Sequence, residues 1–141
     1  MYICSNCWKQ KCNCNKSNYI EIDEGMVDII CKLNKKGYQT LNCCEGHINS
    51  CGICTYIQFK TVYDFKNIPN GFEYDIQEVD GNLLCGINRF VSIDCDKVNG
   101  YFAEVDNKLL NEEQLEFDRL FHLTILNEWI CDLTNLKNDH K

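Results

Sequence analysis

The sequence predicts an α+β protein with a largely antiparallel sheet, one short helix and one long C-terminal helix. An Asp-Gly pair at 80–81 and an Asn-Gly pair at 99–100 mark hairpin turns between runs of alternating apolar residues. Two segments, 24–36 and 112–136, repeat apolar residues at helical spacing. Twelve cysteines, many of them close together, indicate that zinc holds the N-terminal part in place.

The short helix is predicted at residues 24–36. Asp23 has the side chain of a good helix N-cap, and Gly37 is the residue type at which helices commonly end. Between them, apolar residues recur at the i, i+3, i+4, i+7 spacing of a helix with one buried face: Met26, Ile29, Ile30 and Leu33. This segment is therefore expected to bury that face.

Runs rich in aromatic and β-branched residues predict the strands of the sheet. They are expected at 38–43, 55–65, 72–79, 82–88, 89–97 and 101–105. The Asp-Gly and Asn-Gly pairs are the strongest hairpin signals in the chain, and each separates two runs that follow one another closely. Strands joined by such short turns run antiparallel, which gives the predicted sheet its topology.

The last predicted element is a long helix at about 112–136. Asn111, followed three residues later by Gln114, has the sequence of a capping box, in which each side chain binds the other residue's backbone N–H. Beyond this cap an apolar stripe continues at helical spacing: Ile125, Leu126, Trp129, Ile130, Leu133 and Leu136. We expect this helix to lie across one face of the sheet.

Length and composition indicate one folded unit with a metal-dependent extension. The 141 residues, 45% of them hydrophobic, fit one core. Residues 1–18 are polar, rich in cysteine and without a period, so we expect a zinc-binding N-terminal segment there and a single α+β domain at 19–141 with a zinc loop at 43–54. No run approaches the roughly 20 apolar residues of a membrane helix, and no secretory signal is recognisable, so we expect a cytoplasmic protein without membrane contact.

The charge of the chain bears on its partners. The net charge is −7, because 21 acidic residues outnumber 14 basic ones. Proteins that bind nucleic acid directly ordinarily need a surplus of Lys and Arg to displace counterions from phosphates, so such binding is not expected. Acidic residues also line the two arms of the predicted hairpin at 99–100, where they would display a row of negative charge: Asp94, Asp96, Glu104 and Asp106.

The first cysteine cluster is a CxxC pair, Cys4 and Cys7, followed by a CxC pair, Cys12 and Cys14. A CxxC turn directs two sulfurs at one ion, and a tetrahedral zinc site needs two such pairs. Disulfides are not expected in a protein that is not exported. We therefore predict that zinc orders this segment; the alternative is a set of unpaired thiols in a flexible tail.

The second cluster consists of Cys44 and His47, spaced as CxxH, followed by Cys51 and Cys54, spaced as CxxC. Together they make a complete Cys3His set, and a glycine inside each pair helps the backbone to curl around an ion. The loop connects two predicted strands, so zinc bound there would fasten a sheet connection.

The spacing leaves the assignment of ligands open. Zinc sites often combine pairs from distant segments, so Cys4 and Cys7 could close on Cys44 and His47 in one crossed site, and the absence of any metal also remains open. An iron–sulfur cluster suits these polar segments less well than zinc. A nucleophilic thiol beside His47 requires more assumptions than metal ligation. The remaining cysteines, in predicted helices and strands, are expected to be buried thiols without chemistry.

The stretch LNKKGYQTLNCCEGHINSCGICTYIQF carries the pattern GYxTxxCCxGH, followed by YIxF and preceded by the N-terminal CxxC. It resembles an uncharacterised family of small proteins from clostridia, related Gram-positive bacteria and their phages. The matching residues are Gly37, Tyr38, Thr40, Cys43, Cys44, Gly46, His47, Tyr56, Ile57 and Phe59. The resemblance implies a phage or mobile-element origin and supplies no activity. A fainter similarity links YQTLNCCEGHI to the SCSGR segment of wybutosine-synthesis methyltransferases, but the arginine is missing here.

These features together favour binding over catalysis. We expect an acidic zinc-binding protein that binds and inhibits a host protein, for example a nucleic-acid-handling defence enzyme such as a CRISPR effector, by presenting carboxylates where the enzyme accepts phosphates. The alternative is a small-molecule or nucleotide-binding protein, or an enzyme, that uses the Cys/Gly/His loop as an anion site.

Overall fold

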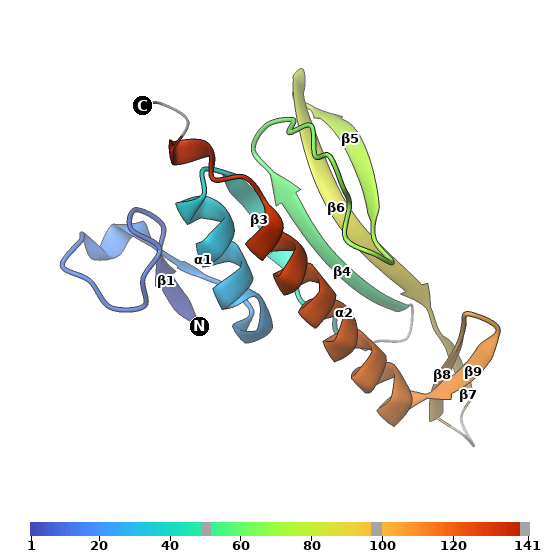
Figure 1. Ribbon diagram of the computed structural model, residues 1–141. Helices are drawn as coiled ribbons and strands as arrows, with labels where there is room; N and C mark the ends of the chain where they lie inside the picture. Colours follow the sequence, from blue (N-terminus) through green and yellow to red (C-terminus); the bar gives the residue numbers. More distant parts are fainter. Residues whose placement is uncertain (49–51, 97–99, 139–141) are drawn as a thin grey trace.

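The computed structural model describes residues 1–48, 52–96 and 100–138, and it confirms the predicted α+β class with antiparallel sheets and two helices (Figure 1). The strands are β1 (Tyr2–Cys4), β2 (Tyr19–Glu21), β3 (Thr40–Cys44), β4 (Gly52–Phe59), β5 (Glu73–Val79), β6 (Asn82–Ser92), β7 (Asp94–Asp96), β8 (Gly100–Val105) and β9 (Lys108–Asn111). The α-helices are α1 (Val27–Lys35) and α2 (Glu112–Asp132), and the 3-10 turns are η1 (Lys16–Asn18), η2 (Glu24–Met26) and η3 (Leu136–Asn138).

The central sheet has the order β3-β4-β6-β5, and α1 and α2 lie side by side across it (Figure 1). Apolar residues alternate along β4, so that Ile57 and Phe59 are at most 1% exposed and face the helices. Ile30 of α1 and Ile130 of α2 meet them in one core. Burying a side chain of this size contributes about 1.5–3 kcal/mol, so this layer is the main source of stability.

The hairpin at Asp80-Gly81 is confirmed. β5 pairs with β6 in antiparallel register, and Asp80 and Gly81 have φ values of 51° and 81°, as a two-residue hairpin turn with a right-handed twist requires. β6 runs unbroken from Asn82 to Ser92, so the prediction of two separate strands at 82–88 and 89–97 was wrong. The reason is that β6 pairs with β4 on one side and β5 on the other, which keeps it straight through residue 88.

A small sheet of order β7-β8-β9 lies at the N-terminal end of α2 (Figure 1). β7 pairs with β8 as the Asn99-Gly100 signal predicts, although residues 97–99 lie outside the described part of the chain. The strand β9 was not predicted. It follows a tight turn at Asp106 and Asn107, which have φ values of 52° and 66°. Asp106 therefore lies in a turn and does not extend a row of strand carboxylates, which corrects that part of the prediction.

Both helices begin where the sequence indicates. The predicted helix at 24–36 is η2 followed by α1, and Gly37, at φ 101°, ends it. The capping box of Asn111 and Gln114 is present at the start of α2. α2 ends at Asp132 and not at 136, because Leu133 is extended. No helix among the described residues is both long and apolar enough to cross a membrane.

The N-terminal segment is connected to the rest of the protein by a two-stranded sheet. β1 pairs antiparallel with β2, and Ile3, which is 0% exposed, belongs to the main core. Residues 5–18 form a loop that projects from this sheet beside α1 (Figure 1). Trp8 is the one residue of that loop, among those described, that packs against the core. The loop therefore has little apolar burial of its own.

Candidate metal centres

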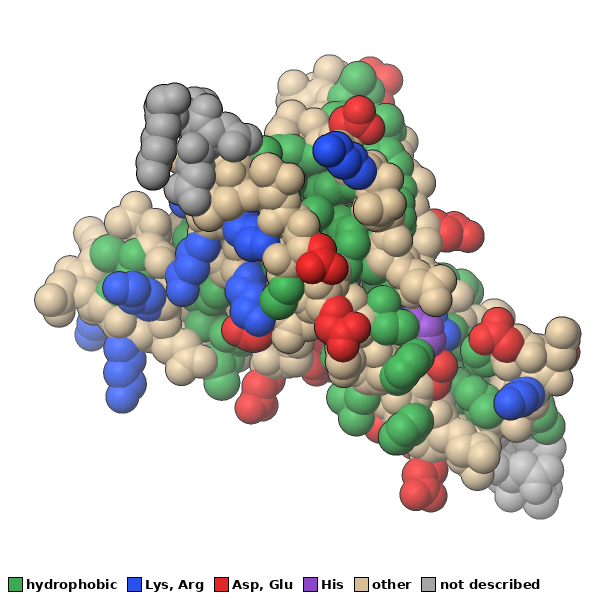
Figure 2. All heavy atoms as spheres, viewed as in Figure 1, with side chains coloured by type: hydrophobic (Ala, Val, Ile, Leu, Met, Phe, Trp, Pro, Cys, Tyr) green, Lys and Arg blue, Asp and Glu red, His purple; other side chains and the backbone are tan. Residues whose placement is uncertain are grey.

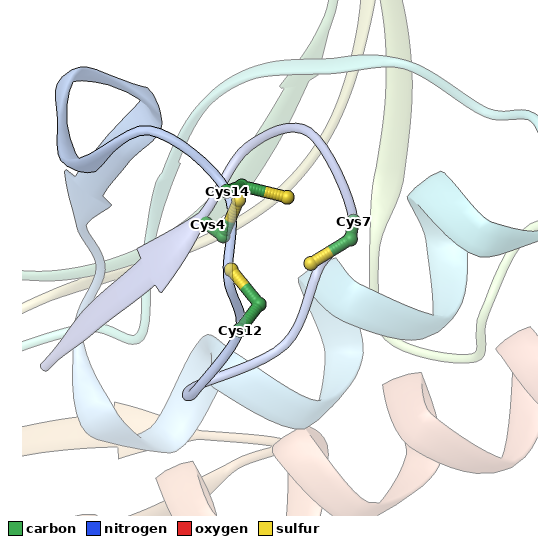
Figure 3. Close-up of side chains that lie close together, drawn as sticks. All are labelled: Cys4, Cys7, Cys12 and Cys14. Carbon is green, nitrogen blue, oxygen red and sulfur yellow. The ribbon is translucent and has the colours of Figure 1, made fainter.

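Four cysteines converge at the N-terminus. Cys4 ends β1, Cys7 lies in the turn that follows, and Cys12 and Cys14 return from the other side of the loop before η1. Their sulfur atoms all lie within 4.8 Å of one another, and the side chains point into a common space (Figure 3). Tetrahedral Zn–S bonds of about 2.3 Å place sulfurs about 3.8 Å apart, so only a small contraction around an ion is needed.

Backbone hydrogen bonds fold the loop around this space. The N–H of Trp8 donates to the Cys4 carbonyl at 2.8 Å, and the N–H of Cys4 donates to Lys9 at 3.1 Å. Trp8 has a φ of 59°, which turns the chain sharply after the CxxC pair. At the far end, both the N–H and the hydroxyl of Ser5 donate to the Asn18 carbonyl. Because Cys4 is fully buried, one ligand of the set is held on the rigid part of the protein.

The thiols of this cluster differ in acidity. A hydrogen bond with the Tyr19 hydroxyl, at 3.3 Å from the Cys12 sulfur, lowers the pKa of Cys12 to about 6. Desolvation, together with hydrogen bonds to the neighbouring thiols, raises the pKa of Cys7 to about 12. Ionisation of the Cys12 thiol is thus favoured, and ionisation of the Cys7 thiol is opposed. A divalent cation at the centre reverses this opposition, because it stabilises all the thiolates that surround it.

The donor set fits a metal ion with a preference for thiolate. Four sulfurs in a tetrahedral arrangement, with no open position, are typical of structural zinc. The cluster at Cys4, Cys7, Cys12 and Cys14 can therefore hold a metal ion, and such an ion would link the two ends of the loop to β1.

The second predicted set is brought together only in part. Cys44 and His47 do lie together, but the third member of their group is the Asp23 carboxylate, and the three ligand atoms lie within 4.8 Å of one another. Cys54 lies within β4, opposite Phe90, and is exposed. Cys51 lies outside the described residues. Among the described residues, Cys4 and Cys7 lie with Cys12 and Cys14 and not with Cys44 and His47, so the first of the two local sets is the one that comes together.

Sequence reasoning missed Asp23 as a candidate ligand. Its position was interpreted as a helix N-cap, but its side chain makes no capping hydrogen bond to η2. Instead Asp23 Oδ2 accepts from the N–H of Glu45, which lies between Cys44 and His47, at 3.1 Å. Asp23 and Cys44 are far apart in the sequence and come together only through the packing of η2 against the β3 end, so no spacing rule identifies the pair.

The other thiols have ordinary structural surroundings. Cys31 and Cys85 are buried, as expected, and burial raises the pKa of each. Cys131 is exposed on α2, so that expectation was wrong for this residue. Desolvation also raises the pKa of Cys43 to about 12 and raises the pKa of Cys44. Nucleophilic cysteines generally have a lowered pKa, so the raised pKa of Cys43 and of Cys44 does not favour a nucleophilic role for either.

α2 also carries a second apolar face that sequence reasoning did not identify. Phe117, Leu120 and Phe121 are 75%, 50% and 55% exposed, at the i, i+3, i+4 spacing of one helix face. We call these three residues the outer face of α2. Glu113 and Glu128 are exposed on the same helix, one before and one after them. Figure 2 shows hydrophobic side chains gathered over α2 with acidic side chains beside them.

Comparison with protein-family models, with curated proteins and with solved structures finds no match for this chain. The class that the fold and site define is therefore a small α+β protein with an N-terminal cysteine cluster that can hold a metal ion.

Proposed function

We propose that this protein is a binding protein with a structural zinc ion. Zn2+ bound by Cys4, Cys7, Cys12 and Cys14 orders the N-terminal loop. The observation that carries the proposal is the convergence of the four sulfur atoms within 4.8 Å. Two further features support it. The loop has almost no core of its own, and one of the ligands, Cys4, is fixed in the main fold. A structural zinc ion contributes binding energy directly to folding.

Metal analysis tests this proposal. Full-length protein, purified without added metal, should contain zinc by elemental mass spectrometry, and Cys7→Ser should lose the equivalent bound at the N-terminus. Cys131→Ser is the matched control, because Cys131 is exposed on α2 and belongs to neither ligand group. A Cys7→Ser protein with the same zinc content as wild type would contradict the proposal.

The binding partner that we favour is a host protein, inhibited by the contact. The outer face of α2 offers exposed aromatic area of the kind that dominates protein interfaces. Glu113 and Glu128 flank it, and the chain carries a net charge of −7. This combination suits a partner with an apolar pocket and a basic rim. Enzymes that bind nucleic acid have basic surfaces, so a nucleic-acid-handling defence enzyme such as a CRISPR effector fits that description.

A cleavage assay tests the inhibitor proposal. Purified CRISPR nuclease is incubated with its guide and DNA target, with and without this protein, and inhibition is expected to be lost in the double variant Phe117→Ser/Phe121→Ser. Phe90→Ser provides the matched control, since Phe90 is 61% exposed on β6. Inhibition should also weaken as salt is raised, because exposed charge contacts are screened. Equal inhibition by wild type and the double variant would exclude this surface as the contact.

A further inference from the structure

We infer that Asp23, Cys44 and His47 form a second metal site, which binds a divalent transition ion such as Zn2+ and leaves one coordination position to an exogenous ligand. The three side chains supply one oxygen, one sulfur and one nitrogen, all accepted ligands of zinc. Zinc sites with three protein ligands characteristically hold water or another small ligand in the fourth position. This site is therefore of a different kind from the four-sulfur cluster at the N-terminus.

The separation of the ligand atoms matches a tetrahedral site. Asp23 Oδ2 lies 3.4 Å from His47 Nε2. That distance is long for a charge-assisted hydrogen bond, which is typically about 2.7–2.9 Å. It agrees with the edge of a tetrahedron whose metal–oxygen and metal–nitrogen bonds are about 2.0–2.1 Å, which is about 3.3–3.4 Å. The two atoms are thus close enough to bind one ion together.

Hydrogen bonds hold two of the ligands in place. The N–H of Glu45 donates to Asp23 Oδ2 at 3.1 Å, and the N–H of Gly46 lies 3.4 Å from Cys44 Sγ and donates to it. Each bond uses a lone pair that a metal ion does not need, so the ligands are oriented and still available. Outer hydrogen bonds of this kind are the usual means by which proteins orient metal ligands.

Hydrogen bonds from three elements also hold Glu45, which lies between Cys44 and His47. Its carbonyl accepts from Thr55 Oγ1 at 3.1 Å and from Arg119 at 3.3 Å, and its carboxylate accepts from the N–H of Gly25 at 2.8 Å. Strand β4, helix α2 and turn η2 therefore all hold the residue between two of the ligands. The part of the loop around Glu45 is therefore held by contacts with three other elements, whereas the N-terminal loop has few contacts with the rest of the protein.

Gly46 shows how tightly this turn is packed. Its φ is +89°, and a Cβ at this position would lie 2.5 Å from Thr55 Oγ1. A larger residue would clash with the Thr55 side chain and would be strained at this φ. His47 follows at the open side, with 62% of its side chain exposed, so an ion bound here is accessible from solvent. No described residue beyond these three belongs to the ligand group, so the described part of the chain supplies three ligands.

Cobalt titration tests the site on the full-length protein. The chain is first loaded with one equivalent of Zn2+, which fills the four-sulfur cluster, and Co2+ is then added while thiolate-to-cobalt charge-transfer absorption is recorded. One further equivalent should bind, with the absorption of a single thiolate. Asp23→Asn should weaken this binding by at least about tenfold, since loss of even an outer ligand partner has an effect of about 10–100-fold. Asp28→Asn, an exposed acid on the neighbouring helix α1, should bind as wild type does.

Three further variants complete the test. Asp23→Asn retains an acceptor for the Glu45 N–H, and His47→Gln changes an exposed side chain. We therefore expect at least one of the two variants to keep the fold, which thermal unfolding measures. Cys54→Ser should leave Co2+ binding unchanged. Unchanged binding in both Asp23→Asn and His47→Gln, or loss of binding in Cys54→Ser equal to that in Cys44→Ser, would overturn the proposed ligand set.

The open position has its own readout. Addition of 2-mercaptoethanol to the cobalt-loaded protein should change the visible bands, because a second thiolate enters the coordination sphere. Bands that do not respond to the added thiol would overturn the open position. Either failure leaves the zinc content of the N-terminal cluster unaffected, so the two metal sites are tested independently.

Discussion

Removal of zinc is expected to release residues 5–18 while β1 stays in place. The perturbation is a chelator added to the zinc-loaded protein. Ile3 is buried in the main core and β1 remains paired with β2 through three residue pairs, so these contacts persist without metal. The loop beyond β1 lacks such contacts and depends on its ligands.

The magnitude can be estimated from the structure. Ordering the loop of about 14 residues costs at least about 14 kcal/mol in backbone entropy. Against this stand a handful of backbone hydrogen bonds, at about 1 kcal/mol each, and the partial burial of Trp8, at about 1–2 kcal/mol. The deficit of about 8–10 kcal/mol is comparable with the roughly 10–16 kcal/mol that structural zinc supplies in small zinc-dependent domains.

Hydrogen exchange followed by NMR measures this effect. With zinc in 100-fold excess over its dissociation constant, the amides of Cys4 and Trp8, which bond to Lys9 and Cys4 within the loop turn, should exchange at least about 100-fold more slowly than without zinc. The amide of Ile57, in the central sheet, serves as the internal control. Equal exchange at Trp8 with and without zinc would refute the reasoning, because it would mean that the loop is ordered without a metal.

Zinc-free protein treated with iodoacetamide at pH 7 should react at Cys12 long before Cys43, because the released loop exposes Cys12 to the reagent, whereas desolvation raises the pKa of Cys43 to about 12. Mass spectrometry of the modified peptides reports the order, and the reverse order would contradict it. Since the thiolate is the reactive form, the rate at Cys43 should still be rising with pH at about pH 10; a midpoint near the ordinary thiol value of 9.0 would refute the raised pKa. Asp118→Ala should lower the free energy of unfolding by about 3–5 kcal/mol in urea denaturation, because it leaves the guanidinium of Arg89, 2.7 Å away and 9% exposed, without its carboxylate. The exposed acid Asp132 is the control, and a loss below about 1 kcal/mol would count against a buried ion pair.

Local signals in the sequence predicted the elements that local forces determine. The turn at Asp80-Gly81 needs only two residues that accept positive φ, and the capping box needs only Asn111 and Gln114. The turn and the capping box can therefore be predicted without knowledge of the fold. The turn before β9 was missed because its positive φ values fall on Asp106 and Asn107, with no glycine to mark them.

The features that the sequence did not reveal depend on distant partners. The length of β6 is determined by the two strands that pair with it. The end of α2 is determined by Lys36, whose Nζ donates to the carbonyls of Ile130 and Leu133. Four cysteines within eleven positions converge because the connecting loop is short, so their spacing alone predicted this cluster. The Asp23 carboxylate joins Cys44 only when η2 packs beside β3, which no local pattern encodes.

The position of α2 along the chain has a consequence for synthesis. This helix completes the main core, yet it follows the central sheet in sequence. The hydrogen bond from Lys36, just after α1, to Ile130 spans 94 residues. While the chain emerges from a ribosome, the apolar face of β4 and β6 is complete before its cover exists. Such faces are prone to aggregation. We therefore expect nascent chains that stop before α2 to need chaperone protection.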